Sequence, residues 1–277
     1  MTPASFATLA GLLHAGSGLV IGPEKVYLLE TRLSAIMRAQ GCAGLDALAL
    51  RLRQPGAGAI ERQVIEAMTT NESFFFRDDK PFAHFRGQAL PGLVAARPAG
   101  VGLRVWSAAA SSGQEAYSLA MILAESALLL RGRAVEIFGT DLSNEQLERA
   151  REGVYSQFEV QRGLPMQLLV KYFKKEGANW RIDPKLRAMV QFRVWNLLAD
   201  PRALGMFDVV FCRNVLIYFD QPTKRRVLEA IARQLAPDGR LYLGGAETIL
   251  GITEALMPVA GERGVYAPAA RRMARAG

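Results

Sequence analysis

Two polar residues that directly follow a buried-strand pattern are the strongest chemical signal in this sequence. Residues 207–212 read Phe-Asp-Val-Val-Phe-Cys, and Arg213 and Asn214 come next. Such an apolar, β-branched run predicts a strand buried in a parallel sheet, and ligands of open α/β sheets bind beyond the carboxyl ends of these strands. Arg213 and Asn214, with Tyr218 shortly after them, are therefore candidate ligand-binding residues. Taken alone, the pattern is also typical of a buried strand with a capped exit, because residues 220–222 predict a helix start.

A turn of small residues at 106–115 is a second candidate binding element. Its sequence, Trp-Ser-Ala-Ala-Ala-Ser-Ser-Gly-Gln-Glu, predicts the end of a strand, a tight turn and a helix that begins near Glu115. Small side chains let a ligand approach the backbone, although they also suit a plain strand–helix turn. The turn lacks the GxGxxG pattern, and the Glu115 carboxylate would repel a phosphate at the helix N-terminus. The position suits a cation such as an amino group.

Asp141 follows the next predicted strand, at 135–140. In nucleoside-binding folds an acid at this point accepts hydrogen bonds from the ribose hydroxyls. The alternative is a helix cap, a role for which Ser143 competes. The small-residue turn, this acid and the polar exit of the 207–212 strand together predict an adenosine ligand without a pyrophosphate. S-adenosylmethionine has a ribose, an amino acid end and no phosphate, and it is therefore the expected cofactor.

The segment Thr-Thr-Asn-Glu-Ser-Phe-Phe-Phe-Arg-Asp at 69–78 is a third candidate. It places three aromatic residues between Asn71 and Arg77. Read in isolation, this pattern indicates either packing between two domains or part of a functional site.

Helical periodicity dominates the first part of the chain. Apolar residues recur at helical spacing over 24–40, 45–53 and 59–70, which predicts an all-helical domain at residues 1–87. Prolines and glycines are frequent at 88–102, which predicts a linker.

Strand and helix patterns alternate over residues 103–277, which predicts a doubly wound α/β domain with a parallel sheet. The alternation stops after residue 153, and a basic stretch with short strand-like pieces, the last at 190–194, predicts an insertion at about 165–195. The expected strands are 103–108, 135–140, 207–212 and 240–245, and the expected helices are 115–130, 144–151 and 221–235.

Composition restricts the class of protein. The 277 residues are 50% hydrophobic, yet no apolar run approaches the ~18 residues of a membrane span, and the N-terminus lacks a secretory signal pattern. Cys42 and Cys212 lie far apart, which favours a reducing cytosol over a disulfide scaffold, and His14 and His84 are too few for a Cys/His metal cluster. The net charge of +8 suits nucleic acid, an acidic protein surface, or a merely solvated face.

Four segments resemble those of CheR-type chemotaxis receptor glutamate methyltransferases, in the same order and spacing. They are TTNESFFFR, VWSAAASSGQEAYSLAM, GTDLS and FDVVFCRNVLIYFD. The resemblance implies a helical N-terminal domain, a Rossmann-like domain that binds S-adenosylmethionine, and a small antiparallel β insertion. It also implies an enzyme that methylates receptor glutamates as γ-carboxyl esters during sensory adaptation and leaves S-adenosylhomocysteine as product. No metal is expected.

The resemblance assigns cofactor contact to nine residues. They are Asn71, Ser73, Arg77, Glu115, Asp141, Asn196, Leu197, Arg213 and Asn214. Glu115 would meet the amino group of the cofactor, Asp141 its ribose, and the pair at 196–197 its adenine. Ser73 stands where threonine is common in the family, and Gln114 where glutamate is common, and both changes preserve hydrogen bonding.

Arg77 and Tyr218 are the expected catalytic residues, and both are expected to act by position. A glutamate carboxylate is already ionised at neutral pH, so methyl transfer to it needs no general base. Arg77 would hold the acidic acceptor and Tyr218 would orient it.

A face of the predicted N-terminal helix, at residues 24–40, is the expected receptor-docking surface. Lys25 and Arg32 are seven residues apart and share a face, with Arg38 on its flank. In the family this helix meets the acidic methylation region in the cytoplasmic, helical part of a chemoreceptor. The loop at 175–179 is short and contains one glycine, so the chain resembles the class that does not tether to a receptor pentapeptide. We expect a cytoplasmic monomer that neither inserts into a membrane nor binds nucleic acid.

Two other functions stay open at this point. A nucleic-acid methyltransferase would fit the positive charge, but the sequence after the 207–212 strand lacks an N-P-P-Y/F motif. A scaffold that binds the cofactor without turnover is the second alternative, although suitable residues fill every matched polar position. A nicotinamide dehydrogenase is disfavoured because the glycine fingerprint is missing.

Overall fold

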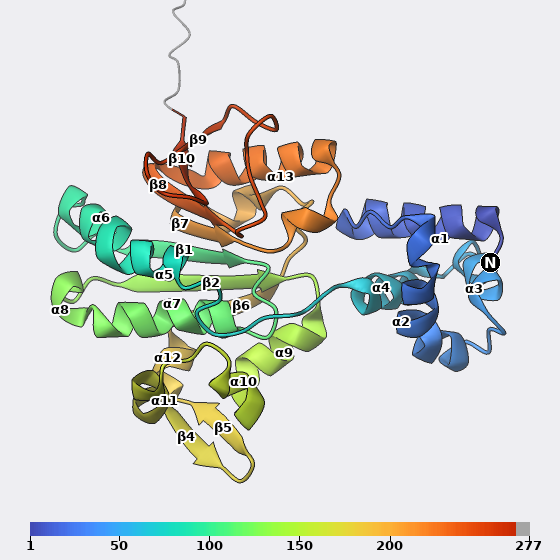
Figure 1. The fold of residues 1–277 in the computed structure, drawn as a ribbon, viewed down its shortest axis with the longest axis horizontal. Helices are drawn as coiled ribbons and strands as arrows, with labels where there is room; N and C mark the ends of the chain where they lie inside the picture. Colours follow the sequence, from blue (N-terminus) through green and yellow to red (C-terminus); the bar gives the residue numbers. More distant parts are fainter. Residues whose placement is uncertain (270–277) are drawn as a thin grey trace, which may run out of the picture. The chain divides into compact units, whose positions relative to one another are not determined.

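The computed structural model describes residues 1–269 and divides them into two compact units. The N-terminal unit comprises residues 1–70 with 218–223, and the C-terminal unit comprises residues 71–217 and those from 224 onward. The predicted fold class, a helical N-terminal part followed by an α/β part with a mainly parallel sheet, is confirmed (Figure 1).

The N-terminal unit is built from helices around an aliphatic core. Leu9, Leu13, Leu29, Leu33 and Val64 are completely buried there. The first helix was not predicted, because its small apolar residues surround the helix axis and give no clear stripe. The elements are α1 (Pro3–Ser17), η1 (Pro23–Lys25), α2 (Val26–Ala39), α3 (Leu45–Leu52) and α4 (Gly58–Met68).

The segment 218–223 completes this unit. The Val20 N–H donates to the Tyr218 carbonyl oxygen at 2.9 Å, and His14 Nε2 lies 2.9 Å from Asp220 Oδ2. Asp220 also caps the helix that follows, because its Oδ1 accepts a hydrogen bond from the Thr223 N–H at 2.9 Å. The predicted helix start at 220–222 is therefore confirmed.

The C-terminal unit contains a seven-stranded sheet in the order β6-β2-β1-β7-β8-β10-β9 (Figure 1). The first five strands of this order are parallel, and β10 is antiparallel to both β8 and β9. The predicted strands at 103–108 and 207–212 match β1 and β7 residue for residue. The strands are β1 (Leu103–Ala108), β2 (Val135–Asp141), β6 (Val190–Val194), β7 (Phe207–Cys212), β8 (Leu235–Leu243), β9 (Leu256–Pro258) and β10 (Val265–Pro268).

The direction of winding reverses between β1 and β7. The chain moves outward from β1 to β2 and β6 on one side, and from β7 to β8 on the other. Such a switch point opens a crevice at the carboxyl ends of the two central strands.

Most helices outside the N-terminal unit belong wholly to the C-terminal unit. They are α5 (Lys80–His84), the π-helical η2 (Phe85–Ala89), α6 (Leu90–Ala96), α7 (Gln114–Glu125), α8 (Ala127–Leu130), α9 (Asn144–Glu152) and η3 (Pro201–Leu204). Two more are divided between the units: the last residue of η4 (Leu216–Tyr218) and the first three residues of α13 (Gln221–Gln234) belong to the N-terminal unit.

The predicted linker at 88–102 and the boundary at residue 87 differ from the structure. The unit boundary falls between residues 70 and 71, and most of α6 lies inside the predicted linker. Phe85, Leu90 and Leu93 belong to the buried core of the C-terminal unit. Pro91 suggested a break, but the chain is helical without interruption from α5 through η2 to the end of α6.

The insertion also begins earlier than predicted. It forms a three-stranded antiparallel sheet in the order β3-β5-β4 that starts at residue 154. The strand-like piece at 190–194, expected in the insertion, is the edge strand β6 of the large sheet and pairs with β2. Periodicity reveals a strand but not its partner, which explains the error. The elements are β3 (Val154–Ser156), α10 (Gln157–Gln161), α11 (Met166–Tyr172), β4 (Phe173–Glu176), β5 (Asn179–Ile182) and α12 (Pro184–Ala188).

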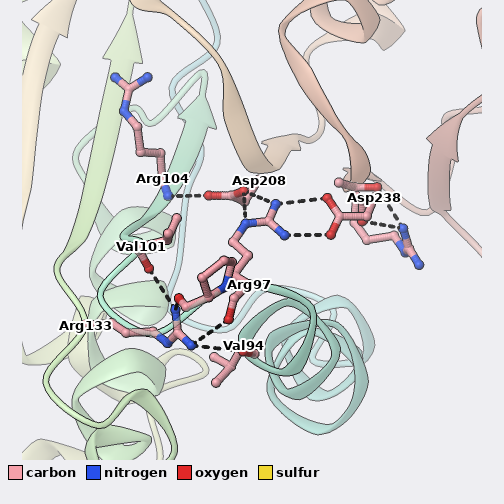
Figure 2. A network of polar contacts seen from close by, with 10 residues as sticks. Val94, Arg97, Val101, Arg104, Arg133, Asp208 and Asp238 are labelled. Carbon is pink, nitrogen blue, oxygen red and sulfur yellow. Dashed lines mark hydrogen bonds and ion pairs between the residues drawn. The ribbon is translucent and has the colours of Figure 1, made fainter.

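An ion-pair network fastens the chain between α6 and β1 at the amino ends of the strands (Figure 2). The Arg97 guanidinium pairs with both oxygens of Asp238, at 2.6 and 2.9 Å, and with Asp208 of β7. Asp208 Oδ2 also accepts a hydrogen bond from the Arg104 N–H of β1 at 2.8 Å. Arg133 donates to four backbone carbonyls between residues 94 and 101. The segment expected as a linker is therefore firmly attached to the sheet.

None of the helices among the described residues is long and apolar enough to cross a membrane.

Candidate active site

Arg213, itself buried, is the centre of a polar cluster at the carboxyl ends of β1 and β7. Its Nη1 lies 3.0 Å from Glu115 Oε2, and its Nη2 lies 2.7 Å from Asp78 Oδ2. Nη2 also donates to the Arg77 carbonyl oxygen at 2.7 Å, and the Ser107 hydroxyl donates to Glu115 Oε1 at 2.8 Å. We call Arg213, Glu115, Asp78 and Ser107 the Arg213 cluster. It joins the ends of two strands, the start of α7 and the 71–78 segment.

Burial governs the electrostatics of this cluster. The Arg213 side chain is only 1% exposed, and its Nε–H has no hydrogen-bond partner within the described residues. Burial raises the pKa of the Glu115 carboxyl, while Arg213 and the Ser107 hydroxyl oppose that rise. A buried donor without a partner is rare in proteins. The cluster therefore has donor capacity that the protein itself does not satisfy.

Asp141 links three loops beside this cluster. Its Oδ2 accepts a hydrogen bond from the Ser111 N–H at 2.8 Å and its Oδ1 from the Ser143 N–H at 3.0 Å, while its carbonyl accepts from Trp195 N at 2.9 Å. Ser143 is the N-cap of α9, because its hydroxyl oxygen accepts from Gln146 N at 3.2 Å. Ser143, and not Asp141, is therefore the N-cap of α9.

The loops around the cluster have unusual backbone conformations. Asp78, Ala109, Ser111 and Asn214 all have positive φ angles, of 66°, 94°, 48° and 58°. Residues other than glycine adopt this region at an energetic cost, and they do so mostly at functional sites where neighbouring contacts enforce it. Here Thr140 enforces it in part, because its carbonyl accepts hydrogen bonds from the backbone N–H groups of both 109 and 110.

The 71–77 segment is attached to the turn after β1. The Ser111 hydroxyl donates to the Asn71 carbonyl at 2.8 Å, and the Phe76 N–H donates to the Ser118 hydroxyl at 3.0 Å. Ser73 is half-buried in this segment. The Arg77 side chain is also half-buried and donates to the Glu72 carbonyl at 3.0 Å.

The loop after β6 lies next to Asp141, since β6 pairs with β2 and Val194 is opposite Asp141. Asn196 turns this loop by accepting a hydrogen bond from the Leu198 N–H at 2.9 Å, and Leu197 is half-buried. The indole Nε1–H of Trp195 is buried without a partner in the part of the chain that the structure describes. The predicted adenine-binding pair is thus beside the predicted ribose-binding acid.

Glu247 is a site residue that the sequence analysis missed. Its carboxylate accepts four backbone hydrogen bonds, from Gly244 N at 2.6 Å, Leu216 N at 2.7 Å, and Asn214 N and Val215 N at 2.9 Å. These bonds hold the chain after β7 and enforce the positive φ of Asn214. An acid just beyond the end of β8 was the available signal, because that end shares an edge with the ends of β1 and β7.

All nine residues expected to contact the cofactor belong to the C-terminal unit. Hydrogen bonds join Arg213 to Glu115 and to the Arg77 carbonyl, and Ser111 joins Asp141 to Asn71. The other expected residues belong to the N-terminal unit. There Tyr218 is half-buried, and Lys25 and Arg38 are exposed. Arg32 donates to the carbonyls of Met68 and Thr69, at 2.7 and 3.0 Å, so it caps the C-terminus of α4 as well as lying on the predicted docking face.

Two family models match the chain in consecutive regions. Residues 4–69 match the CheR methyltransferase all-alpha domain, and residues 71–265 match the CheR methyltransferase SAM binding domain. The chain belongs to the CheR methyltransferase family. The predicted family is therefore confirmed, and so is S-adenosylmethionine as the ligand class of the second domain.

Curated relatives cover most of the chain. It is 42% identical to "Chemotaxis protein methyltransferase 1" of Pseudomonas aeruginosa, over 89% of this chain and 90% of that protein. It is 39% identical to "Chemotaxis protein methyltransferase Cher2" of Pseudomonas putida, over 87% and 89%. Among solved structures, PKMT2 from Rickettsia typhi in complex with AdoHcy is similar to this chain, with 18% identity and a TM-score of 0.38. The matched region covers 63% of this chain and 26% of the PKMT2 chain.

Proposed function

We propose that this CheR-family protein transfers a methyl group from S-adenosylmethionine to glutamate side chains in the cytoplasmic helical region of chemoreceptors. The products are glutamate γ-methyl esters and S-adenosylhomocysteine, and the change adjusts receptor signalling during adaptation. The observation that carries the proposal is the Arg213 cluster next to Asp141, at the switch point of a sheet matched by the family's SAM binding domain.

The residues of this chain fit the cofactor. Glu115 provides a buried carboxylate for the amino group, and Arg213 provides a buried Nε–H donor for an acceptor atom. Asp141 provides two carboxylate oxygens for the ribose hydroxyls, and residues 195–197 flank the position of the adenine. Asn71 and Ser73 complete the site from the 71–77 segment, and Asn214 does so from the loop after β7.

The protein has little chemistry to perform beyond positioning. The bound cofactor supplies an electrophilic methyl group on a sulfonium centre, and the acceptor glutamate is already an anion at neutral pH. Arg77 binds the acceptor carboxylate and Tyr218 orients it, and neither residue transfers a proton. Alignment of the two reactants and exclusion of water supply the acceleration, because water stabilises the separated charges better than the charge-neutralising transition state.

The docking surface belongs to the same proposal. Exposed Lys25 and Arg38 on either end of α2 attract the acidic methylation region of the receptor, with Arg32 between them. The β4–β5 turn is short, since Glu176 pairs with Asn179, and this supports membership of the pentapeptide-independent class. We propose a cytoplasmic monomer that works without a metal ion, without nucleic acid and without membrane insertion.

The test is mass spectrometry of a receptor cytoplasmic fragment after incubation with the protein and methyl-labelled S-adenosylmethionine. We expect label on glutamate carboxylates, released by mild base as methanol because esters hydrolyse readily. A matched fragment with those glutamates changed to alanine should take up no label. Transfer to RNA in place of the receptor would support the nucleic-acid alternative. Tight cofactor binding without transfer to any receptor would support the scaffold.

A further inference from the structure

The ring of Phe74 has an arginine beside it from two different parts of the C-terminal unit. The guanidinium carbon of Arg77 lies 5.3 Å from the ring centroid, and that of Arg162 lies 4.2 Å from it. Cations within about 6 Å of an aromatic centroid are attracted by the ring. Arg77 belongs to the same segment as Phe74, whereas Arg162 follows α10 in the insertion. The guanidinium groups of Arg77 and Arg162 therefore both lie next to the Phe74 ring.

Glu72 contacts both arginines, with its carboxylate on Arg162 and its backbone carbonyl on Arg77. Arg162 Nη2 donates to Glu72 Oε1 at 2.5 Å, and Arg77 Nη1 donates to the Glu72 carbonyl at 3.0 Å. Both arginine charges lower the pKa of the Glu72 carboxyl, Arg162 more strongly. The side chains of Glu72 and Arg162 are 53% and 42% exposed, so solvent and other molecules reach the ion pair. Exposed pairs of this kind contribute little to stability and exchange partners easily.

The insertion is held in place next to Arg77 by its backbone. Gly163, the residue after Arg162, has a φ of +84°, and a Cβ atom there would collide with the Phe75 carbonyl oxygen. Only glycine combines this conformation with such a close approach. Arg162 is therefore supported by a close backbone contact with the 71–77 segment.

We propose that Arg162 is an acceptor-binding, specificity-determining residue: it binds a carboxylate of the substrate segment near Arg77, and the Glu72 carboxylate occupies Arg162 until the acceptor replaces it. The inference rests on the proposed function, because it requires an acidic acceptor. Glu72 has the same side-chain chemistry as the proposed substrate, so the exchange replaces one carboxylate–guanidinium pair with another. The insertion then contributes directly to acceptor selection.

Steady-state kinetics with the full-length protein and a receptor cytoplasmic fragment test this inference. We expect Arg162→Ala to raise the KM for the receptor by about 10-fold, the effect of losing one charge-assisted pair, and Arg162→Lys to recover part of it. Calorimetry should give an unchanged affinity for S-adenosylhomocysteine. Glu72→Gln should lower the receptor KM, because the internal competitor is weakened.

Arg181→Ala is the matched control. Arg181 is a second arginine of the insertion, and it pairs with an exposed glutamate, Glu176, at 2.8 Å with similar exposure. We expect its removal to leave the receptor KM unchanged. Equal KM increases for both alanine variants would overturn the proposal and show a general attraction by the basic insertion.

Two further results would also overturn it. One is a loss of S-adenosylhomocysteine affinity in Arg162→Ala with an unchanged receptor KM, which would make Arg162 a support for the cofactor segment. The other is a raised receptor KM in Glu72→Gln. Failure of the proposed function is recognised separately, because the unaltered protein would then transfer no methyl group to the receptor.

Discussion

Strand β7 has an arginine bound to two carboxylates at each of its ends, and the two networks differ in how completely they are satisfied. At the amino end, Arg97 uses Nε, Nη1 and Nη2 to bind Asp208 and Asp238 (Figure 2). At the carboxyl end, Arg213 donates from Nη1 to Glu115, and from Nη2 to Asp78 and the Arg77 carbonyl. Its buried Nε–H has no partner among the described residues.

The surrounding backbone differs in the same way. Six non-glycine residues with positive φ lie in the segments around Arg213, namely Phe76, Asp78, Asp79, Ala109, Ser111 and Asn214. In the network around Arg97, the non-glycine residue with such a φ is Arg131, next to Arg133. Strain and unsatisfied donors persist where a ligand is needed, and they are removed where only stability is selected. We therefore propose that the amino end of β7 is a structural clamp and that the carboxyl end is the binding site.

The largest expected effect comes from replacing the arginine of the binding site. Arg213→Met should reduce affinity for S-adenosylhomocysteine by roughly 100-fold or more, because it removes the charged donor that positions Glu115, the Arg77 carbonyl and Asp78. Isothermal titration calorimetry measures this loss. Glu115→Gln, which keeps the shape of the side chain, serves as the variant that is expected to fold. Unchanged affinity in a folded Glu115→Gln protein would remove the cluster from the site.

Replacing the other arginine should affect stability alone. We expect Arg97→Met to lower the free energy of unfolding by about 2–4 kcal/mol, because Asp208 and Asp238 lose a largely buried partner. Chemical denaturation measures the change, and Arg202→Met, which removes an exposed pair with Asp200, is the control with little expected effect. A loss of cofactor affinity in the folded Arg97→Met protein would contradict the division of roles between the two ends.

Asp141→Ala should weaken cofactor binding by roughly 1–3 kcal/mol, the range for lost hydrogen bonds to a charged group. Part of this loss is indirect, because the Ser111 and Ser143 N–H groups also lose their acceptor. Asp141→Asn is the milder variant, because it keeps the shape of the side chain and one acceptor oxygen, although its NH2 group cannot accept from the second N–H. Wild-type affinity in both folded variants would exclude Asp141 from the site.

The smallest expected effect is a pH dependence of the clamp. Arg97 holds the pKa of the Asp238 carboxyl below its usual range. A carboxyl with a lowered folded-state pKa contributes stability above its unfolded-state pKa of about 3.9, and loses it as the pH falls through the folded-state value. The stability difference between the unaltered protein and Arg97→Met should therefore shrink below about pH 4. Urea denaturation of both proteins at several pH values measures this difference in the free energy of unfolding. A difference that stays constant with pH would show that the Asp238 carboxylate does not contribute to the clamp.

The sequence predicted the elements that carry the site because their signals are local. The strands β1 and β7 are continuous apolar runs, and Glu115, Asp141 and Arg213 lie directly at the ends of predicted elements. The rule that ligands bind at carboxyl ends of parallel strands then placed these residues at one edge without any knowledge of the structure. The resemblance to the family added the individual roles.

The remaining features depend on contacts between distant residues. Glu247 binds the N–H of Asn214 from 33 positions away, and Arg162 binds Glu72 from 90 positions away. The edge strand β6 was assigned to the insertion because spacing along the chain does not identify a pairing partner. Arg32 was predicted only as a docking residue, since a sequence does not show that its guanidinium reaches the end of α4.

A crystal structure of the protein with S-adenosylhomocysteine tests the assignment of the two ends of β7 most directly. We expect the ribose hydroxyls on the Asp141 carboxylate, the amino group on Glu115, and a ligand or water acceptor at Arg213 Nε, with the Arg97 network unchanged. S-adenosylhomocysteine bound away from the Arg213 cluster, with Arg213 Nε still unpartnered, would contradict the account.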